Sequence, residues 1–65
     1  MKWSEVKRRL KMYGCYKYKN GTNHERWKSP ITGAIKNIGR HDSQEVNTKT
    51  AADIFKAMGV PMYDA

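Results

Sequence analysis

The sequence predicts a small α+β domain with the order α-β-β-β-α, in which two amphipathic helices cover one face of a three-stranded antiparallel sheet. Apolar residues recur with helical spacing near both ends of the chain. Between these stretches, residues alternate with the two-residue period of strands, and turn sequences at 20–21 and 29–33 separate the alternating runs. The uncovered face of such a sheet is expected to meet solvent.

The first helix is expected over residues 4–13. The hydroxyl of Ser4 is predicted to cap its first turn, and Gly14 is predicted to end it, because glycine tolerates positive φ. The apolar stripe of this helix has members three or four residues apart: Trp3, Val6, Leu10 and Tyr13. Three cations lie largely off the stripe and are expected on the outer surface: Lys7, Arg8 and Lys11.

The first strand is expected over residues 15–19, where tyrosines and lysines alternate. It is followed by Asn20-Gly21, the strongest hairpin signal in the chain, because both residue types tolerate positive φ. Tyr16 and Tyr18 share one side of this strand. We interpret that side as the one that faces the core.

The second strand is expected over residues 24–29. Trp27 is the largest apolar group available and must face the core, together with the residues that share its side, Glu25 and Ser29. Alternation then directs three residues away from the core in a row: His24, Arg26 and Lys28.

The third strand is expected over residues 34–39. Ile35 and Ile38 fall on opposite faces under strict alternation, so either a bulge intervenes or one isoleucine is exposed. The last helix is expected over residues 47–59, with a capping-box-like pair of Thr50 and Asp53 near its start. Its apolar stripe is Ala51, Ile54, Phe55 and Met58. Residues 1–65 are expected to form a single domain, with a loose tail over about 61–65.

The net charge and its distribution along the chain are the most informative features of the composition. The chain of 65 residues has a formal net charge of +7. Residues 1–41 hold eleven Lys and Arg against two acidic residues, a balance of +9, whereas residues 42–65 hold two lysines against four acidic residues, a balance of −2. A cationic body of this kind attracts the phosphates of nucleic acids, although basic charge also serves solubility alone.

The cysteine count, the hydropathy and the motif content of the sequence exclude several classes of protein. The single cysteine, Cys15, allows neither an internal disulfide nor a cysteine-built zinc site. We interpret it as a small, part-buried strand residue, with a nucleophilic role as the alternative. No apolar run has the length of a membrane span, and no HExxH motif, acidic cluster or Gly-rich phosphate loop is present. We therefore expect a cytoplasmic protein that uses no metal and no cofactor.

The outward row on the second strand suits metal-free cleavage of RNA. Such a reaction needs a group that moves protons to or from the ribose 2′-hydroxyl and the leaving oxygen, and cations that stabilise the charged phosphoryl group. Histidine suits the proton work because the ordinary pKa of imidazole, about 6.5, lies near neutral pH. His24 is thus the candidate general acid or base, with Arg26 and Lys28 at the phosphates; the alternative is a solvated strand histidine.

His41 is a candidate second proton carrier, although its polar surroundings favour a surface histidine. The aromatic residues Tyr16, Tyr18 and Trp27 allow base stacking, but core packing is favoured.

The chain resembles the HicA family of toxins from bacterial and phage toxin–antitoxin pairs. The resemblance is carried by the opening residues 1–5, the Gly14 turn, the segment Gly21 to Trp27, Ser29-Pro30, Thr32-Gly33, Arg40-His41 and the closing helix with Gly59-Val60. It covers nearly the whole length in order. Where family members often have Gly-Ser or Gly-Asn before the histidine, this chain has Thr22-Asn23.

The resemblance implies a fold like the double-stranded-RNA-binding domain and an mRNA interferase that acts without a metal and arrests growth. The family's active histidine maps onto His24, and four cations are expected to contact the RNA phosphates: Lys19, Arg26, Lys28 and Arg40. A HicB-like antitoxin is the implied protein partner, and DNA would be bound only indirectly, through that antitoxin. Two other functions remain open for the same basic face: a non-catalytic RNA-binding module, and a docking domain for an acidic protein.

Overall fold

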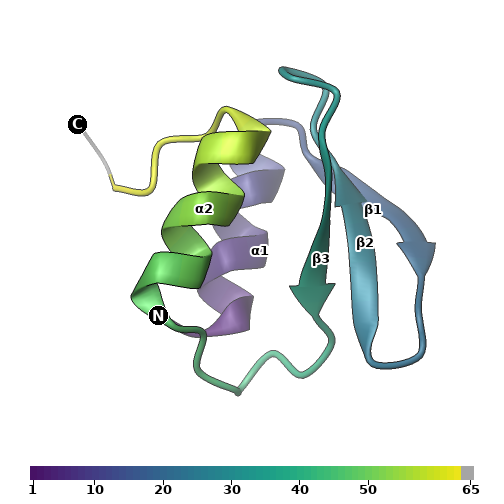
Figure 1. Cartoon of the computed structure of the whole chain (residues 1–65), viewed down its shortest axis with the longest axis vertical. Coiled ribbons are helices and arrows are strands. Elements are labelled where there is room, and N and C mark those ends of the chain that lie inside the picture. The colour runs from purple at the N-terminus through teal and green to yellow at the C-terminus, as the bar shows by residue number, and fades with distance from the viewer. Residues whose placement is uncertain (64–65) are drawn as a thin grey trace.

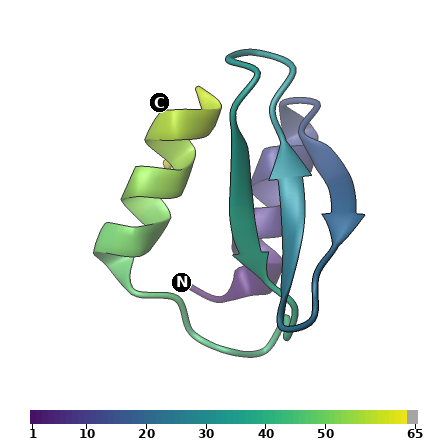
Figure 2. The same ribbon diagram turned by 45° about the vertical axis from the view of Figure 1, so that its right-hand side comes forward.

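The computed structural model describes residues 1–63 and confirms the predicted α-β-β-β-α order, with two helices on one face of the sheet (Figures 1 and 2). The three strands pair antiparallel in the order β1-β2-β3, so β2 is central. No helix or loop among residues 1–63 covers the sheet face opposite the helices (Figure 2). The elements are α1 (Trp3–Met12), β1 (Tyr16–Asn20), β2 (His24–Lys28), β3 (Ile35–Gly39) and α2 (Thr48–Met58).

The core lies between the two helices and the inner face of the sheet. Both predicted helical stripes contribute to it, although Tyr13, at the end of the first stripe, is exposed. Burial of these apolar side chains is the main stabilising contribution to so small a fold. The core residues are Val6, Leu10, Cys15, Trp27, Ile38, Val46, Ala51, Ile54, Phe55, Met58 and Val60.

The start of α1 differs from the prediction, since Ser4 does not cap it. The helix begins at Trp3, and Ser4 lies within its first turn. The first amides are instead bound by the β3–α2 connection: the Trp3 N–H donates to the Gln44 carbonyl and the Ser4 N–H to the Asp42 carbonyl, both at 3.1 Å. A distant loop therefore satisfies the donors that a side-chain cap normally satisfies. The end of α1 is as predicted, with Gly14 at φ 87°.

The predicted capping pair of Thr50 and Asp53 in the last helix is also wrong. α2 begins at Thr48, two residues before Thr50, and the side chain of Asn47 caps it by accepting from the Lys49 N–H at 2.8 Å. Gly59 ends the helix at φ 71°, as predicted. In the expected loose tail, Met62 packs partly against the core, whereas Asp64 and Ala65 lie outside the described residues.

The turn at 29–33 is confirmed, and it binds the end of α2. The Ser29 hydroxyl, completely buried, donates to the Met58 carbonyl at 2.6 Å. The Thr32 hydroxyl donates to the Ala57 carbonyl at 2.7 Å. The last carbonyls of a helix have no partner within the helix, so these two hydroxyls satisfy groups that would otherwise need water.

The inward and outward sides of β2 are as predicted. Trp27 is 2% exposed, and Glu25 is half-buried beside it, whereas His24 and Arg26 are exposed. The pairing of β2 with β3 is continuous from His24↔Gly39 to Lys28↔Ile35. No bulge therefore separates the two isoleucines: Ile38 faces the core, and Ile35 lies half-buried on the outer face.

The prediction that Tyr16 and Tyr18 face the core is wrong. Their exposed fractions are 47% and 56%. Tyr16 pairs with Lys28, which is on the outer face, whereas Lys17 pairs with Trp27 and takes the inner side. A bulge follows, in which Tyr18 is the extra residue, and Lys19 pairs with Arg26. The bulge shifts the alternation by one residue, which puts Lys19 on the outer face as well.

The hairpin at Asn20-Gly21 is confirmed, but its glycine is needed for a different reason from the predicted one. Neither residue has positive φ. The Gly21 N–H donates to the His24 carbonyl at 2.8 Å. A Cβ at Gly21 would lie 2.6 Å from that carbonyl oxygen, so a side chain there would push the loop away from His24.

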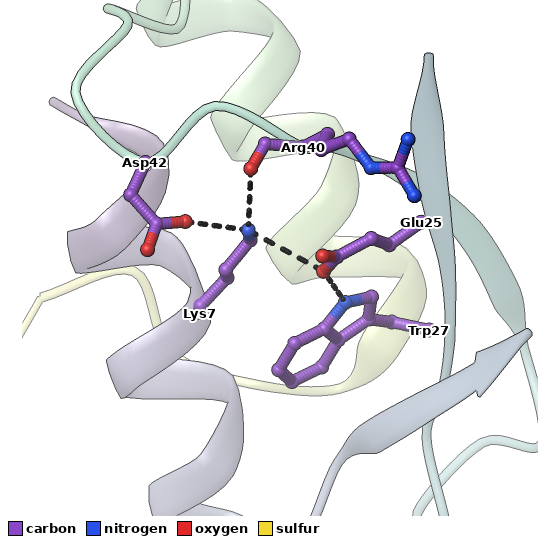
Figure 3. Close-up of polar contacts among 5 residues, drawn as sticks. All are labelled: Lys7, Glu25, Trp27, Arg40 and Asp42. Carbon is purple, nitrogen blue, oxygen red and sulfur yellow. Dashed lines mark hydrogen bonds and ion pairs between the residues drawn. The ribbon is translucent and has the colours of Figure 1, made fainter. Parts of the chain in front are cut away.

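Lys7 is the main departure from the predicted surface of α1. Its side chain is only 11% exposed, although it was expected to point outward. Figure 3 shows its ammonium among three oxygens, one from β2 and two from the connection that follows β3. The Nζ atom lies 2.6 Å from Asp42 Oδ1, 3.3 Å from Glu25 Oε1 and 3.3 Å from the Arg40 carbonyl oxygen. The network is completed by Trp27, whose Nε1–H donates to Glu25 Oε1 at 3.0 Å.

This network changes the acidity of both carboxyl groups. Burial raises the pKa of Glu25, but the hydrogen bonds from Trp27 and Lys7, together with the charges of Lys7 and Lys17, lower it by more, so that it lies below its ordinary value of 4.5. The hydrogen bond and the charge of Lys7 hold the pKa of Asp42 below its ordinary value of 3.8. Both carboxylates are therefore better stabilised as anions in the folded chain than in the unfolded one.

Replacing Lys7 by methionine is expected to lower the free energy of unfolding by about 2–3 kcal/mol, because Glu25 then stays part-buried without a cation. The matched control is Arg8→Met on the adjacent, exposed position of α1, which is expected to change it by less than about 0.5 kcal/mol. Urea denaturation of the three proteins measures the difference. Equal effects of the two substitutions would contradict the role assigned to Lys7.

The melting temperature is expected to be nearly constant from pH 7 down to about 5.5 and to fall below about pH 4.5. The sign follows from the lowered pKa values of Glu25 and Asp42: their contribution is complete above the unfolded-state pKa and is lost as the pH falls through the folded-state value. Glu25→Gln should melt lower at neutral pH and show a smaller further decrease in acid. Asp53→Asn, at an exposed position of α2, should keep the wild-type decrease. Calorimetry across this pH range measures each curve.

Candidate functional site

The candidate site is the uncovered side of the sheet, which we call the outward face. Strand pairing places His24, Arg26 and Lys28 of β2 on this face, with Lys19 beside Arg26. Within residues 1–63, none of the strand positions on the outward face is acidic. The side chains of this set are Tyr16, Tyr18, Lys19, His24, Arg26, Lys28, Ile35 and Asn37.

His24 is exposed, but its backbone is held on both sides. It is the first residue of β2 and pairs with Gly39 of β3. Its carbonyl accepts the Gly21 N–H at the hairpin. Gly39 is itself buried against Trp3 of α1, since a Cβ at Gly39 would overlap the Trp3 indole. The imidazole is therefore presented to solvent from a fixed position, which suits a group that must meet a large substrate.

Lys19 and Arg26 are cross-strand neighbours on the outward face. Side chains at such positions have Cβ atoms about 4.5–5.5 Å apart, so two positive charges are held close together. Like charges directly opposite each other destabilise a sheet unless an anion comes between them. The pair is therefore suited to bind a phosphate group. Arg26 is two residues from His24 on the same side of β2, so this phosphate would lie next to the histidine.

Lys28 marks the other end of the outward face. Its ammonium lies 5.8 Å from the centre of the Tyr18 ring, within the range of a cation–π contact. Tyr16 is its pairing partner on β1. Lys28 is four residues from His24 along one strand, a separation of about 13 Å. The cations thus extend along β2 and do not gather at one point.

Arg40 has a different position from the other predicted RNA contacts. It follows the last residue of β3, and its Nη1 donates to the Thr22 carbonyl at 3.0 Å. Its own carbonyl accepts from Lys7. Arg40 therefore links the hairpin loop before His24 to the buried Lys7 network, and Figure 3 shows the contact of its carbonyl with Lys7. It lies beside the site and holds the hairpin loop that precedes the histidine.

His41 lies in the exposed connection after β3, two residues beyond the pairing partner of His24. Cys15, predicted to be a part-buried strand residue, is buried and lies just before β1, which begins at Tyr16. In the part of the chain that the structure describes, no three side chains of His, Cys, Asp or Glu come together in an arrangement that could hold a metal ion. Within the same residues, neither helix is long and apolar enough to cross a membrane.

Sequence reasoning missed Lys7 and the outward tyrosines. One signal for Lys7 was present: Glu25 was placed on the inner side of β2 beside Trp27, and an inward carboxylate requires a donor or a cation. The helix position next to Val6 could have supplied it. No comparable signal showed which face of β1 carries Tyr16 and Tyr18. Either face could take them until the pairing of β1 with β2 was known.

The comparisons with known proteins give one match. The family model described as HicA toxin of bacterial toxin-antitoxin matches residues 3–60. Comparison with curated proteins and with solved structures gave no match. The family match runs from the first residue of α1 past the end of α2 and so includes every element and the outward face. The chain therefore belongs to the HicA family of bacterial toxins from toxin–antitoxin systems.

Proposed function

We propose that this toxin is a metal-independent endoribonuclease that cleaves messenger RNA, with His24 as its general acid or base. The observation that carries the proposal is the outward face: an exposed histidine, its backbone held by pairing, lies on the same face as three cations, and within residues 1–63 no outward strand position is acidic. A polyanion fits this face better than any neutral substrate.

The chemistry follows from the groups present. The ribose 2′-oxygen attacks the adjacent phosphorus, and the bond from phosphorus to the 5′-oxygen of the next nucleotide breaks. His24 either takes the proton from the 2′-hydroxyl or gives one to the leaving 5′-oxygen. Lys19 and Arg26 stabilise the negative charge that grows on the phosphoryl oxygens. The products are a 2′,3′-cyclic phosphate and a free 5′-hydroxyl, and DNA is inert because it lacks the 2′-hydroxyl.

Membership of a toxin–antitoxin family implies an antitoxin, and we propose that it is a HicB-like protein acting in the cytoplasm with the toxin. The cationic outward face gives such a partner a surface to neutralise. Non-catalytic RNA binding and pure protein docking use the same face, so strand scission is the property that separates the three functions.

His24→Ala is expected to reduce the rate of RNA cleavage by about 10²–10⁴-fold, the usual contribution of a positioned proton-transfer group. The assay uses single-stranded RNA in the presence of EDTA and detects the cyclic phosphate end. The matched control is His41→Ala, the other histidine, which should retain most of the activity. Undiminished cleavage by the His24 variant would overturn the assignment, and RNA binding without any cleavage by the wild type would favour the binding module.

Lys19→Ala combined with Arg26→Ala is expected to make RNA binding less dependent on salt. Each cation that neutralises a phosphate of a single strand contributes about 0.7 to the slope of log K against log salt, so the slope should fall by about 1.4. Binding is measured in the His24→Ala background, where RNA stays intact. The control removes Lys49 and Lys56, two exposed lysines of α2, and should leave the slope nearly unchanged. Equal loss in both double variants would mean that binding follows net charge alone.

A further inference from the structure

We infer that Tyr16 and Tyr18, with Lys28 beside them on β2, form a subsite that stacks the unpaired bases of single-stranded RNA. The inference deepens the proposed function, on which it rests for the identity of the ligand as RNA. It adds a recognition site for bases at a distance from His24, and it specifies unpaired RNA as the form that this site binds.

The first argument is exposure. Two aromatic rings lie on an uncovered sheet face with 47% and 56% of their surfaces open to solvent. The core is complete without them, since Trp27, Phe55 and the aliphatic residues fill the space under the helices. Alternation puts Tyr18 on the face that already holds Tyr16, and the bulge after Lys17 brings Lys19 to the same face. Bulges are often found where a binding surface needs a side chain to be redirected.

The second argument is that a cation lies next to the two rings. Tyr18 lies 5.8 Å from the Lys28 ammonium, and Tyr16 pairs with the same lysine across the strands. Proteins that bind single strands combine stacking rings for the bases with cations for the phosphates. An apolar docking surface would need further apolar side chains around the rings. Ile35 is the other large apolar residue on the outward strand positions, and it is half-buried.

The third argument is spacing along β2. His24 and Lys28 mark the two ends of a row about 13 Å long, with Arg26 and Lys19 between them. An RNA strand lying along this row has a phosphate near His24 while bases further along reach the tyrosines. In a duplex the bases are stacked inside the helix and cannot offer their faces to a tyrosine. The subsite therefore selects unpaired RNA, although the fold itself resembles a domain that binds double strands.

The test measures binding in the His24→Ala background, so that the RNA is not cut. Three probes carry the same fluorescent label: a short single-stranded RNA, the same strand with abasic sites in place of its bases, and the corresponding duplex. Tyr16→Leu with Tyr18→Leu should weaken binding of the single strand by at least about tenfold, because stacking of one base on one ring accounts for that much. Binding of the abasic strand and of the duplex should change less than about twofold, because their phosphates meet the same cations.

Two matched controls define the effect. Tyr13→Leu with Tyr63→Leu removes two exposed tyrosines outside the sheet and should leave all three affinities unchanged. Tyr16→Phe with Tyr18→Phe keeps both rings and should retain single-strand affinity within about twofold, which also shows that any loss in the leucine variant comes from stacking. A 2-aminopurine base in the single strand should be quenched on binding by the phenylalanine variant and not by the leucine variant.

The inference is overturned if the leucine variant binds the single strand as tightly as the parent protein, or if it loses the abasic strand equally. It is also overturned if RNA binding is unchanged while binding to the antitoxin is lost, since the rings would then be a protein-docking site. These outcomes are separate from failure of the proposed function. If the wild type never cleaves RNA but its binding depends on the two rings, the proposed ribonuclease activity is wrong and the stacking subsite stands. If the wild type cleaves RNA and binding does not depend on the rings, the activity stands and the subsite is wrong.

Discussion

The ammonium of Lys7 is the contact on which the rest of the structure depends. It joins α1 to Glu25 of β2, to Asp42 and to the Arg40 carbonyl, so one cation ties together a helix, the central strand and the long connection (Figure 3). Without it, Glu25 would stay part-buried with the Trp27 indole as its remaining partner in the network. A small core has little free energy to offset such a loss, which makes this polar network as important as the apolar packing around it.

The same contact determines how the site is presented. Successive residues of a strand point to opposite faces, so fixing Glu25 and Trp27 inward fixes His24 and Arg26 outward. The Arg40 side chain extends this control to the hairpin loop through its bond to Thr22. The histidine is thus exposed, while its backbone is held by strand pairing and by the hydrogen bond from Gly21. A chain of this size has no room for an interior active site, and a rigid sheet face with a basic row is the arrangement that remains.

The outward face has two chemically distinct ends. His24 lies at the hairpin end of β2, where proton transfer is proposed, and Lys28 lies with two tyrosines at the other end. The cation pair of Lys19 and Arg26 connects them. For the proposed function, this arrangement would separate the reaction from the recognition of bases, so that specificity for the form of the RNA would not require contacts next to the reacting phosphate.

The sequence by itself determined the element order, the helical stripes, the turns and the outward direction of His24, Arg26 and Lys28. These features depend on local periodicity and on one large residue, Trp27, that has to be buried. Only the tertiary structure decided how α1 begins, the burial of Lys7 and the face taken by Tyr16 and Tyr18. The physical reason is that each depends on a partner distant in the chain: carbonyls of the β3–α2 connection at the start of α1, Glu25 and Asp42 for the lysine, and the bulged pairing with β2 for the tyrosines.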